Sequence, residues 1–454
     1  MNDSSDNSRD SFSSRFAVIA AVAGSAIGLG NIWRFPYVAG ENGGGAFLII
    51  YLLFVFAIGI PVMTSEFVIG RAGQKNPYGS FRKLAPGQPW YLIGIMGVAA
   101  AFMILAFYTT VSGWTLEYFY QTLTGNLAGK NDSELTLMFD EFLQGSYRPV
   151  IWFVVFMGFT GFIILSGVKN GIERYTKMLM PILFVLLIAL CIRSVTLEGS
   201  RAGLNFLFYP DFGKITPKVI LEALGQAFFS LSIGMGTLIT YGSYINKSEN
   251  LGSSAVAVSI ADTLIAIIAG VAIFPAVFAL GGSPASGTGL VFIVLPGVFQ
   301  KMPLGQVFQL IFFILLAVAA LTSTISVLEV IVAYLVEELR MTRKKATIAA
   351  TLMVSVLGIV TVLSMGSLRN LTIAGKNIFG LLEFLTSNIM LPLGGLFIVI
   401  FIGWSFNPQR TKDELTNEGK LKAGYLPVYM FIVRFVAPVA IAMVFLYSLG
   451  ILKL

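Results

Sequence analysis

Long apolar segments follow one another along almost the whole chain, and this repetition constrains the fold more than any other feature. A membrane-spanning helix needs about 20 consecutive apolar residues, and eleven segments reach or approach this length. Inside a bilayer every backbone polar group must be satisfied within the segment, which favours helices. The sequence therefore predicts an all-α polytopic membrane protein with 11 transmembrane helices. The predicted spans are 16–38, 46–70, 90–120, 150–167, 176–195, 219–245, 254–281, 306–338, 346–366, 376–404 and 427–451.

The composition supports this class and excludes several functions. Only 12% of the 454 residues are charged, against about 25% in a soluble domain. The chain has no histidine and a single cysteine, Cys191. It therefore lacks the commonest general base and transition-metal ligand, and it cannot form an internal disulfide bond. The net charge of +7 is typical of basic cytoplasmic loops and does not indicate a nucleic-acid partner.

The distribution of basic residues predicts the orientation. Alternate loops hold sixteen Lys and Arg side chains, including the cluster Arg340–Lys345, whereas the other loops and the C-terminal tail hold ten. Because cytoplasmic loops are enriched in basic residues, we expect the N-terminus inside and, with an odd number of spans, the C-terminus outside. Residues 1–15 lack the features of a signal peptide.

The first apolar segment is interrupted between residues 24 and 36, which read GSAIGLGNIWRFP. Glycine costs about 1 kcal/mol relative to alanine inside a helix, and Asn31 and Arg34 are expensive in a bilayer unless they are satisfied. A helix that stops near Ala26 and restarts near Leu29 would present free carbonyls to a small cation and free N–H groups to a carboxylate. The alternative is that these glycines only allow close helix packing.

The sixth segment carries a similar interruption at residues 225–236, which read GQAFFSLSIGMG. Interrupted segments at corresponding positions of two halves are typical of inverted-repeat transporters with a binding site at the membrane midplane. We therefore expect a 5+5 inverted repeat in which helices 1 and 6 are broken. The predicted parts are a cytoplasmic N-terminal segment (1–15), a first five-helix repeat (16–195), an external loop (196–218), a second five-helix repeat (219–404), and a cytoplasmic loop with the eleventh helix (405–454). The stretches 121–149 and 196–217 are expected as external loops, and 282–304 as a loop that caps a cavity.

Three polar side chains within other apolar segments are candidates for a functional site. Thr322 and Ser323 are adjacent hydroxyls in the eighth segment, and such hydroxyls can either bind a ligand or bond back to their own helix. Asp262 lies in the seventh segment. A carboxylate at membrane depth indicates a functional site, unless it lies at the helix end in water.

Together these motifs resemble the neurotransmitter:sodium symporter family, and in particular its bacterial eleven-span members, over essentially the whole chain. The resemblance implies the leucine-transporter fold. The residues that carry it are Gly24–Pro36, Glu41–Phe47, Gly225–Gly236, Tyr241–Tyr244 and Leu321–Ser323.

The resemblance implies two co-transported sodium ions and no organic cofactor. Sodium is a hard cation that suits oxygen ligands. The first ion would be held by the Ala26 carbonyl, Asn31, Ser230, Asp262 and the substrate carboxylate. The second would be held by the carbonyls of Gly24, Ile27 and Ala319 and the hydroxyls of Thr322 and Ser323.

The resemblance also bears on chloride. In chloride-dependent relatives the position of Asp262 is neutral, and a chloride ion lies nearby. The other positions of that anion site correspond to Tyr51, Gln226, Ser230 and Ala266. Because Asp262 can supply the negative charge itself, we expect transport that does not depend on chloride.

The substrate expected from the resemblance is a hydrophobic L-amino acid, aliphatic or aromatic and including tryptophan. Its carboxylate would meet the N–H groups of Leu29 and Gly30 and the Tyr108 hydroxyl, and its amino group would meet carbonyls near Phe229 and Ser232. The substrate side chain would be lined by Ala26, Ile104, Phe229, Met235, Ser323 and Val327. This lining has no charge that could pair with an ionised side chain of the substrate. Met235 is flexible and suits ligands of different shape, although methionines also fill apolar cores.

Gates are carried over in the same way. On the outside, Tyr108 and Phe229 would close under Arg34, whose partner is left open because Glu383, the only acid on the tenth span, does not match in register. On the inside, Arg9 and Glu337 match a gate pair, with Phe12 and Tyr244 nearby. Gly171 and Pro181 would let the start of the fifth span unwind toward the second sodium site; a plain proline kink is the alternative.

The sequence thus predicts a sodium-coupled symporter that works by alternating access in the bacterial cytoplasmic membrane, as a monomer or weak dimer in contact with lipid. A channel would need a continuous polar pore or a repeated filter, and an enzyme would need a catalytic constellation; the sequence offers neither. An amino acid sensor that binds without concentrative transport is the remaining alternative.

Overall fold

The computed structural model describes residues 14–285, 289–448 and 450–452, and in these ranges the regular structure is helical. Nine continuous helices in the described ranges are long and apolar enough to cross a membrane. They are Gly45–Gly73 (α3, η2 and α4), Tyr91–Leu123 (α6), Arg148–Leu165 (α8), Val168–Val195 (η3 and α9), Leu251–Ala279 (α13), Gly305–Glu338 (α15), Arg343–Leu363 (α16), Ile378–Ser405 (α17 to η7) and Leu426–Tyr447 (α20 to α21).

A tenth span is a broken pair of helices at the start of the chain. α1 (Arg15–Ala26) ends at the predicted position, and the chain resumes with the short π-helix η1 (Gly30–Arg34) and α2 (Phe35–Glu41). The two parts are bent by 48° relative to one another. Gly28 lies in the break, where an added Cβ would be 2.1 Å from the Ser323 hydroxyl. Only glycine therefore allows the backbone to pass this close to α15.

The second predicted interruption is also present. α11 (Pro217–Ser230) and α12 (Thr237–Gly242) are separated by residues 231–236. Gly234 and Gly236 have positive φ values of 82° and 80°, a conformation that glycine adopts at little cost. Each of these two helices is too short to span a bilayer alone. If they form one span, the total is the predicted eleven, a number that stays a prediction along with the repeat boundaries.

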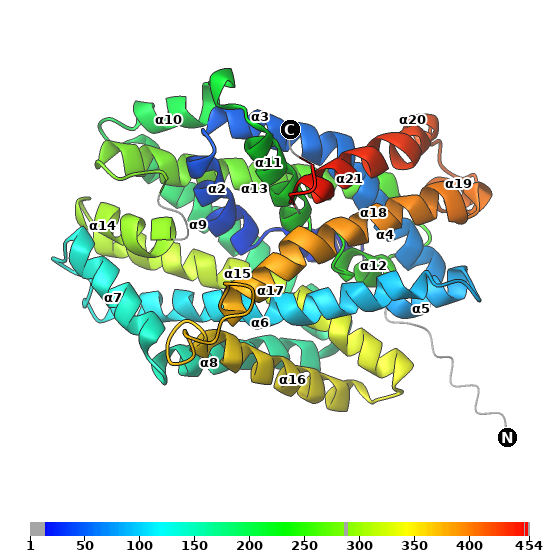
Figure 1. Cartoon of the computed structure of the whole chain (residues 1–454), viewed down its shortest axis with the longest axis horizontal. Coiled ribbons are helices and arrows are strands. Elements are labelled where there is room, and N and C mark those ends of the chain that lie inside the picture. Colours follow the sequence, from blue (N-terminus) through cyan, green and yellow to red (C-terminus); the bar gives the residue numbers. More distant parts are fainter. Residues whose placement is uncertain (1–13, 286–288, 449, 453–454) are drawn as a thin grey trace.

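Figure 1 shows the helices arranged along one long axis. The two longest, α6 and α15, contact each other. α5 (Pro77–Leu84), α19 (Pro408–Thr416) and α20 (Leu426–Phe431) lie at one end of the bundle, hereafter the α19 end, at the right of Figure 1. α7 (Asp132–Gln144), α10 (Arg201–Phe208) and α14 (Leu295–Gln300) lie at the other end, hereafter the α7 end.

Three stretches that the sequence indicated as loops contain short helices. α7 lies within 121–149, α10 within 196–217, and η5 (Leu290–Val294) with α14 within 282–304. α7 begins with a reciprocal capping box between Asn131 and Glu134, which stabilises a helix start. Pro296 occupies the first turn of α14, where proline is tolerated. A search for spans of about 20 consecutive apolar residues misses these helices because they are shorter than that.

Candidate functional site

The two broken spans face each other and share hydrogen bonds. Gln226 of α11 donates its Nε2 to the carbonyl of Gly30 at 2.8 Å, and the Ser232 hydroxyl donates to the carbonyl of Ser25 at 3.3 Å. Both acceptors are carbonyls next to the break in the first span. The breaks thus satisfy part of each other's exposed backbone, as non-helical backbone at membrane depth requires.

Three of the residues predicted for the first sodium site meet directly. Asp262 of α13 is fully buried and accepts hydrogen bonds from Asn31 Nδ2 and the Ser230 hydroxyl, each at 2.7 Å. The Tyr51 hydroxyl lies 3.4 Å from the same carboxylate. Asp262 is therefore inside the protein and not at a helix end in water. These three hydrogen-bond partners are neutral, so the negative charge of Asp262 is suited to a bound cation. Ala26, the fourth predicted residue, is the last residue of α1.

The residues predicted for the second sodium site lie between α1 and α15. The Thr322 hydroxyl is 2.9 Å from the Ala319 carbonyl and 3.3 Å from the Ile27 carbonyl. The neighbouring Ser323 hydroxyl instead donates to the Ser25 carbonyl at 3.3 Å. One hydroxyl and two carbonyls thus converge on one region, whereas Ser323 is directed to a carbonyl outside the predicted set.

The last member of that set, Gly24, lies against α9. An added Cβ at Gly24 would be 2.5 Å from the Thr176 side chain, so the second sodium region contacts the helix predicted to unwind. At the start of that helix, residues 168–173 form the π-helix η3, and Pro181 lies inside α9. An added Cβ at Gly171 would be 2.2 Å from the Ile163 carbonyl, which gives this glycine a packing reason as well.

The ten predicted substrate residues are all buried. They are Ala26, Leu29, Gly30, Ile104, Tyr108, Phe229, Ser232, Met235, Ser323 and Val327. The Leu29 N–H donates to the Tyr108 hydroxyl at 2.8 Å, so the two groups predicted to meet a carboxylate are adjacent. The Phe229 ring is next to Gly30, where an added Cβ would lie 3.3 Å from it.

Arg34, predicted as an outer gate, has an uncharged partner that the sequence did not indicate. Its Nη1 donates to Gln226 Oε1 at 2.7 Å, and its guanidinium lies 4.8 Å from the centre of the Phe229 ring. Glu383 is close enough to interact electrostatically with Arg34. Gln226, which the sequence assigned only to a possible anion site, thus connects Arg34 and Gly30 of the first broken span to the second broken span.

The predicted inner pair of Arg9 and Glu337 stays a prediction, and Tyr244 bonds to another acid nearby. Tyr244 donates to Glu329 Oε1 at 2.7 Å, and Arg343 forms an ion pair with the same buried carboxylate at 2.6 Å. Glu337 accepts hydrogen bonds from the backbone and side chain of Asn76. Arg9 and Phe12 lie outside the described residues. Glu329 was missed, although an acid within an apolar span is a signal that could have found it.

Glu66 of α4 (Ile60–Gly73) is a second missed acid. It is fully buried and accepts a hydrogen bond from the Gly234 N–H at 2.8 Å. It therefore anchors the break between α11 and α12 to a neighbouring helix. Its position inside the second apolar segment was the available signal.

Comparison with known proteins decides the family. The family model of the sodium:neurotransmitter symporter family matches residues 9–138 and 144–453 of this chain. The chain belongs to this family.

Individual relatives agree with this assignment. The chain is 40% identical over 442 residues to the uncharacterized sodium-dependent transporter YhdH of Bacillus subtilis, covering 97% of this chain and 98% of that protein. It is 28% identical to the sodium- and chloride-dependent GABA transporter 2 of Bos taurus, covering 97% and 80%. The crystal structure of MhsT in complex with L-phenylalanine matches with a TM-score of 0.90 and 48% identity, covering 97% and 100%. These findings confirm the predicted family and all-α fold, and they identify a sodium-dependent membrane transporter and not an enzyme.

Proposed function

We propose that this protein is a symporter that couples the entry of two sodium ions to the import of one hydrophobic L-amino acid, without a need for chloride. Sodium-dependent transport follows from the family. The structural similarity to MhsT, which was crystallised with L-phenylalanine, supports an amino acid substrate.

The observation that carries the proposal is the group formed by Asp262, Asn31 and Ser230. It joins both broken spans to α13 through hydrogen bonds of 2.7–3.1 Å. A buried carboxylate at this point can hold one sodium ion and also supply the fixed negative charge that chloride would otherwise provide. The family resemblance implies that the residue at this position is neutral in chloride-dependent members.

The residues proposed to line the substrate site support an apolar side chain. The ten residues are buried and include no Asp, Glu, Lys or Arg. An ionised ligand side chain would therefore be desolvated without a partner, at a cost of several kcal/mol. The adjacent Tyr108 hydroxyl and Leu29 N–H suit the carboxylate of a zwitterion instead.

The second sodium ion is proposed to lie beside Thr322, Ala319 and Ile27, with Gly24 and Ser323 in the same region. Contact between Gly24 and Thr176 gives α9 a route to control its release. One charge crossing 100 mV is worth about 2.3 kcal/mol, so two ions can drive substantial accumulation. Arg34 and the Tyr244–Glu329 pair are the proposed outer and inner gates, with Arg9 and Glu337 as further members of the inner one.

We infer from the basic residues that the α19 end faces the cytoplasm. Arg82 and Lys83 end α5, and Arg410 and Lys412 lie on α19. By the positive-inside rule, this supports a protein of the bacterial cytoplasmic membrane with its N-terminus inside the cell and its C-terminus outside, as proposed.

The test is uptake of labelled phenylalanine, leucine and tryptophan into proteoliposomes under an inward sodium gradient. Uptake should vanish when potassium replaces sodium, and it should be unchanged when gluconate replaces chloride. Loss of uptake in gluconate would refute chloride independence while keeping sodium coupling. Saturable binding with no concentrative uptake under any gradient would favour an amino acid sensor.

A further inference from the structure

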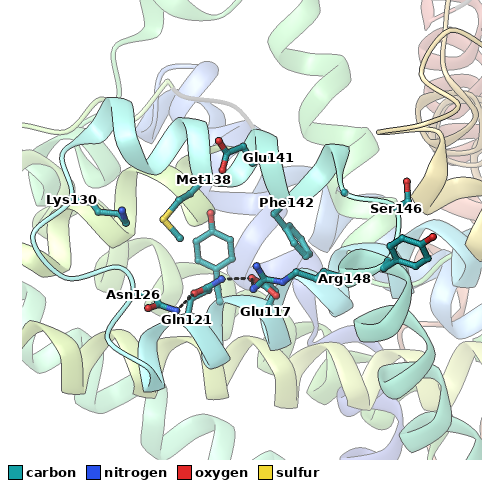
Figure 2. A pocket seen from close by; sticks show the side chains of 12 residues that line it. Glu117, Gln121, Asn126, Lys130, Met138, Glu141, Phe142, Ser146 and Arg148 are labelled. Atoms are coloured by element: carbon teal, nitrogen blue, oxygen red, sulfur yellow. Dashed lines mark hydrogen bonds and ion pairs between the residues drawn. The ribbon is translucent and has the colours of Figure 1, made fainter.

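A cavity of about 620 Å³ lies at the α7 end, between the last turns of α6, the helix α7 and the start of α8. We refer to it as the α7 pocket, and Figure 2 shows the side chains around it. Ligand pockets for small molecules usually measure about 300–1,000 Å³, so this volume suits a molecule the size of an amino acid. The lining includes Glu117, Tyr118, Gln121, Asn126, Lys130, Met138, Glu141, Phe142 and Arg148.

One side of the α7 pocket is a fixed charged group. The Glu117 carboxylate, 1% exposed, accepts hydrogen bonds at 2.5 Å from Arg148, Gln121 and Trp152. Gln121 in turn accepts a hydrogen bond from Asn126 at 2.8 Å. The charge of Glu117 is therefore neutralised by Arg148, and its oxygens are already engaged. These residues form one wall of the pocket, and they need no charged ligand to balance their own charges.

Tyr118 presents a buried hydroxyl with no partner. The residue is 2% exposed, and its hydroxyl makes no hydrogen bond within the described residues. The ring is held against Phe139, Phe292 and Phe313, with centroid distances of 5.2–6.0 Å. A buried hydroxyl without a partner is destabilising, because the hydrogen bond it made to water is not replaced. A ligand that accepts a hydrogen bond from Tyr118 would remove this cost.

Two side chains of opposite charge also line the pocket without being engaged. Among the residues that the structure describes, neither Lys130 nor Glu141 forms a hydrogen bond or an ion pair through its side chain. Figure 2 shows them approaching the cavity from different sides, with Met138 between them in this view. The four charged residues of the lining sum to zero, because Glu117 and Glu141 balance Lys130 and Arg148.

We propose that the α7 pocket binds a zwitterionic amino acid with an apolar side chain. Lys130 and the Tyr118 hydroxyl bind its carboxylate, Glu141 binds its ammonium group, and Met138 and Phe142 contact its side chain. A ligand with only one charge would leave either Lys130 or Glu141 without a counter-charge, whereas a zwitterion pairs both. The pocket shares no residue with the site between the broken spans, so the proposed binding there is separate from that site and is expected without sodium.

Sodium-free binding separates the two sites. The full-length protein in lipid nanodiscs, with potassium in place of sodium, is titrated with labelled L-phenylalanine. We expect saturable binding of one molecule per chain. Lys130→Ala and Glu141→Gln should each weaken it about tenfold, which corresponds to roughly 1.4 kcal/mol. Lys214→Ala and Glu198→Gln, which change exposed residues outside the pocket, should leave it unchanged. Sodium-driven uptake is measured separately, so the proposed function and this pocket can fail independently.

Two ligand analogues test which pocket residue binds the carboxylate of the ligand and which binds its ammonium group. L-phenylalaninamide lacks the carboxylate, so its weaker binding should be unaffected by Lys130→Ala. N-acetyl-L-phenylalanine lacks the ammonium group, so its weaker binding should be unaffected by Glu141→Gln. If both analogues bind as well as phenylalanine, the zwitterion assignment is wrong.

Tyr118→Phe distinguishes ligand binding from a structural role. Removal of an unpartnered hydroxyl should leave thermal stability equal or higher, while phenylalanine binding weakens severalfold. Absence of sodium-free binding, or binding that ignores Lys130, Glu141 and Tyr118 alike, overturns the proposal.

Discussion

Asp262 is the residue at which we propose that ion binding and chloride independence come together. It accepts hydrogen bonds from Asn31 and Ser230 and is fully buried. Asp262→Ser removes the charge but keeps a small polar side chain. We expect uptake in chloride-free medium to fall at least tenfold and to recover in part when chloride is added, because the added anion replaces the lost charge. Uptake in gluconate that equals that of the unchanged protein would contradict this role.

Tyr108 is the residue we expect to orient the substrate. Its hydroxyl accepts the Leu29 N–H at 2.8 Å, so the hydroxyl is held ready to donate to a carboxylate. Tyr108→Phe removes this donor and leaves the ring in place. The Kd for phenylalanine in the presence of sodium should rise about tenfold, roughly the 1.4 kcal/mol of one charge-assisted hydrogen bond. Thr109→Val, which alters the next residue of the helix, is the control and should have little effect on binding.

The sequence indicated most of the central residues but not how they pair. Asn31, Ser230 and Asp262 could be predicted because polar groups at membrane depth are expensive, and a family motif assigned them together. The pairing of Arg34 with Gln226 could not be predicted, because an uncharged amide gives no charge pattern to match. Glu66 and Glu329 could have been found as acids within apolar spans, but their partners depend on helix packing that no local pattern shows.

At the scale of elements, the break between α11 and α12 depends on Gly234. This glycine has a φ of 82°, and an added Cβ would be 2.5 Å from the carbonyl of Leu391 at the start of α18 (Leu391–Ile400). Gly234→Ala should therefore lower the thermal stability by more than the roughly 1–2 kcal/mol of a left-handed residue, and it should reduce uptake. Gly158→Ala is the matched control, because Gly158 lies in α8 with open space around its Cα. It should be neutral or stabilising by about 1 kcal/mol. Equal effects of the two substitutions would argue against the importance of this break.

The α9 helix supplies a second prediction at this scale. Pro181 removes one backbone hydrogen bond inside α9, and we propose that this loss eases unwinding near the second sodium region. Pro181→Ala restores that bond. We expect uptake to slow severalfold while sodium-dependent phenylalanine binding is retained, measured on the same preparation. Unchanged uptake would support a proline kink that has no part in gating.

The long helices and their approximate bounds could be predicted from the lengths of the apolar segments, because helices are the main structure by which such segments cross a bilayer. The broken spans were found because glycine and proline interrupt otherwise apolar runs. The short helices α7, α10 and α14 were missed because their length is below that of a span. The π-helical turns, such as η3, depend on neighbouring helices and leave no clear local signal.

At the scale of the whole molecule, a buried ion pair closes the α19 end. Arg71 at the end of α4 is fully buried and bonds to Glu414 of α19 at 2.7 Å and to the Glu249 carbonyl at 2.7 Å. Lys247 also contacts Glu414. Removing one partner of a buried pair leaves an uncompensated charge and costs about 3–5 kcal/mol. Glu414→Gln should therefore lower the thermal stability markedly.

The control for this prediction lies on the same helix. Asp413 is partly exposed, and its side chain accepts one hydrogen bond from Gln409. Asp413→Asn should therefore change stability by less than about 0.5 kcal/mol. A similar loss for both substitutions would show that α19 itself, and not the Arg71 pair, is sensitive to change.

The lengths of α6 and α15 have a mechanical consequence. At 1.5 Å per residue, helices of 33 and 34 residues are each about 50 Å long. Tyr108 is the eighteenth residue of α6, and Ser323 is the nineteenth of α15. Both therefore lie at the midpoint of a long lever. A rotation of about 10° about that fulcrum would displace each end by roughly 4 Å and scarcely move the centre. The same small tilt can thus widen one end of the bundle and narrow the other while the proposed substrate groups keep their places.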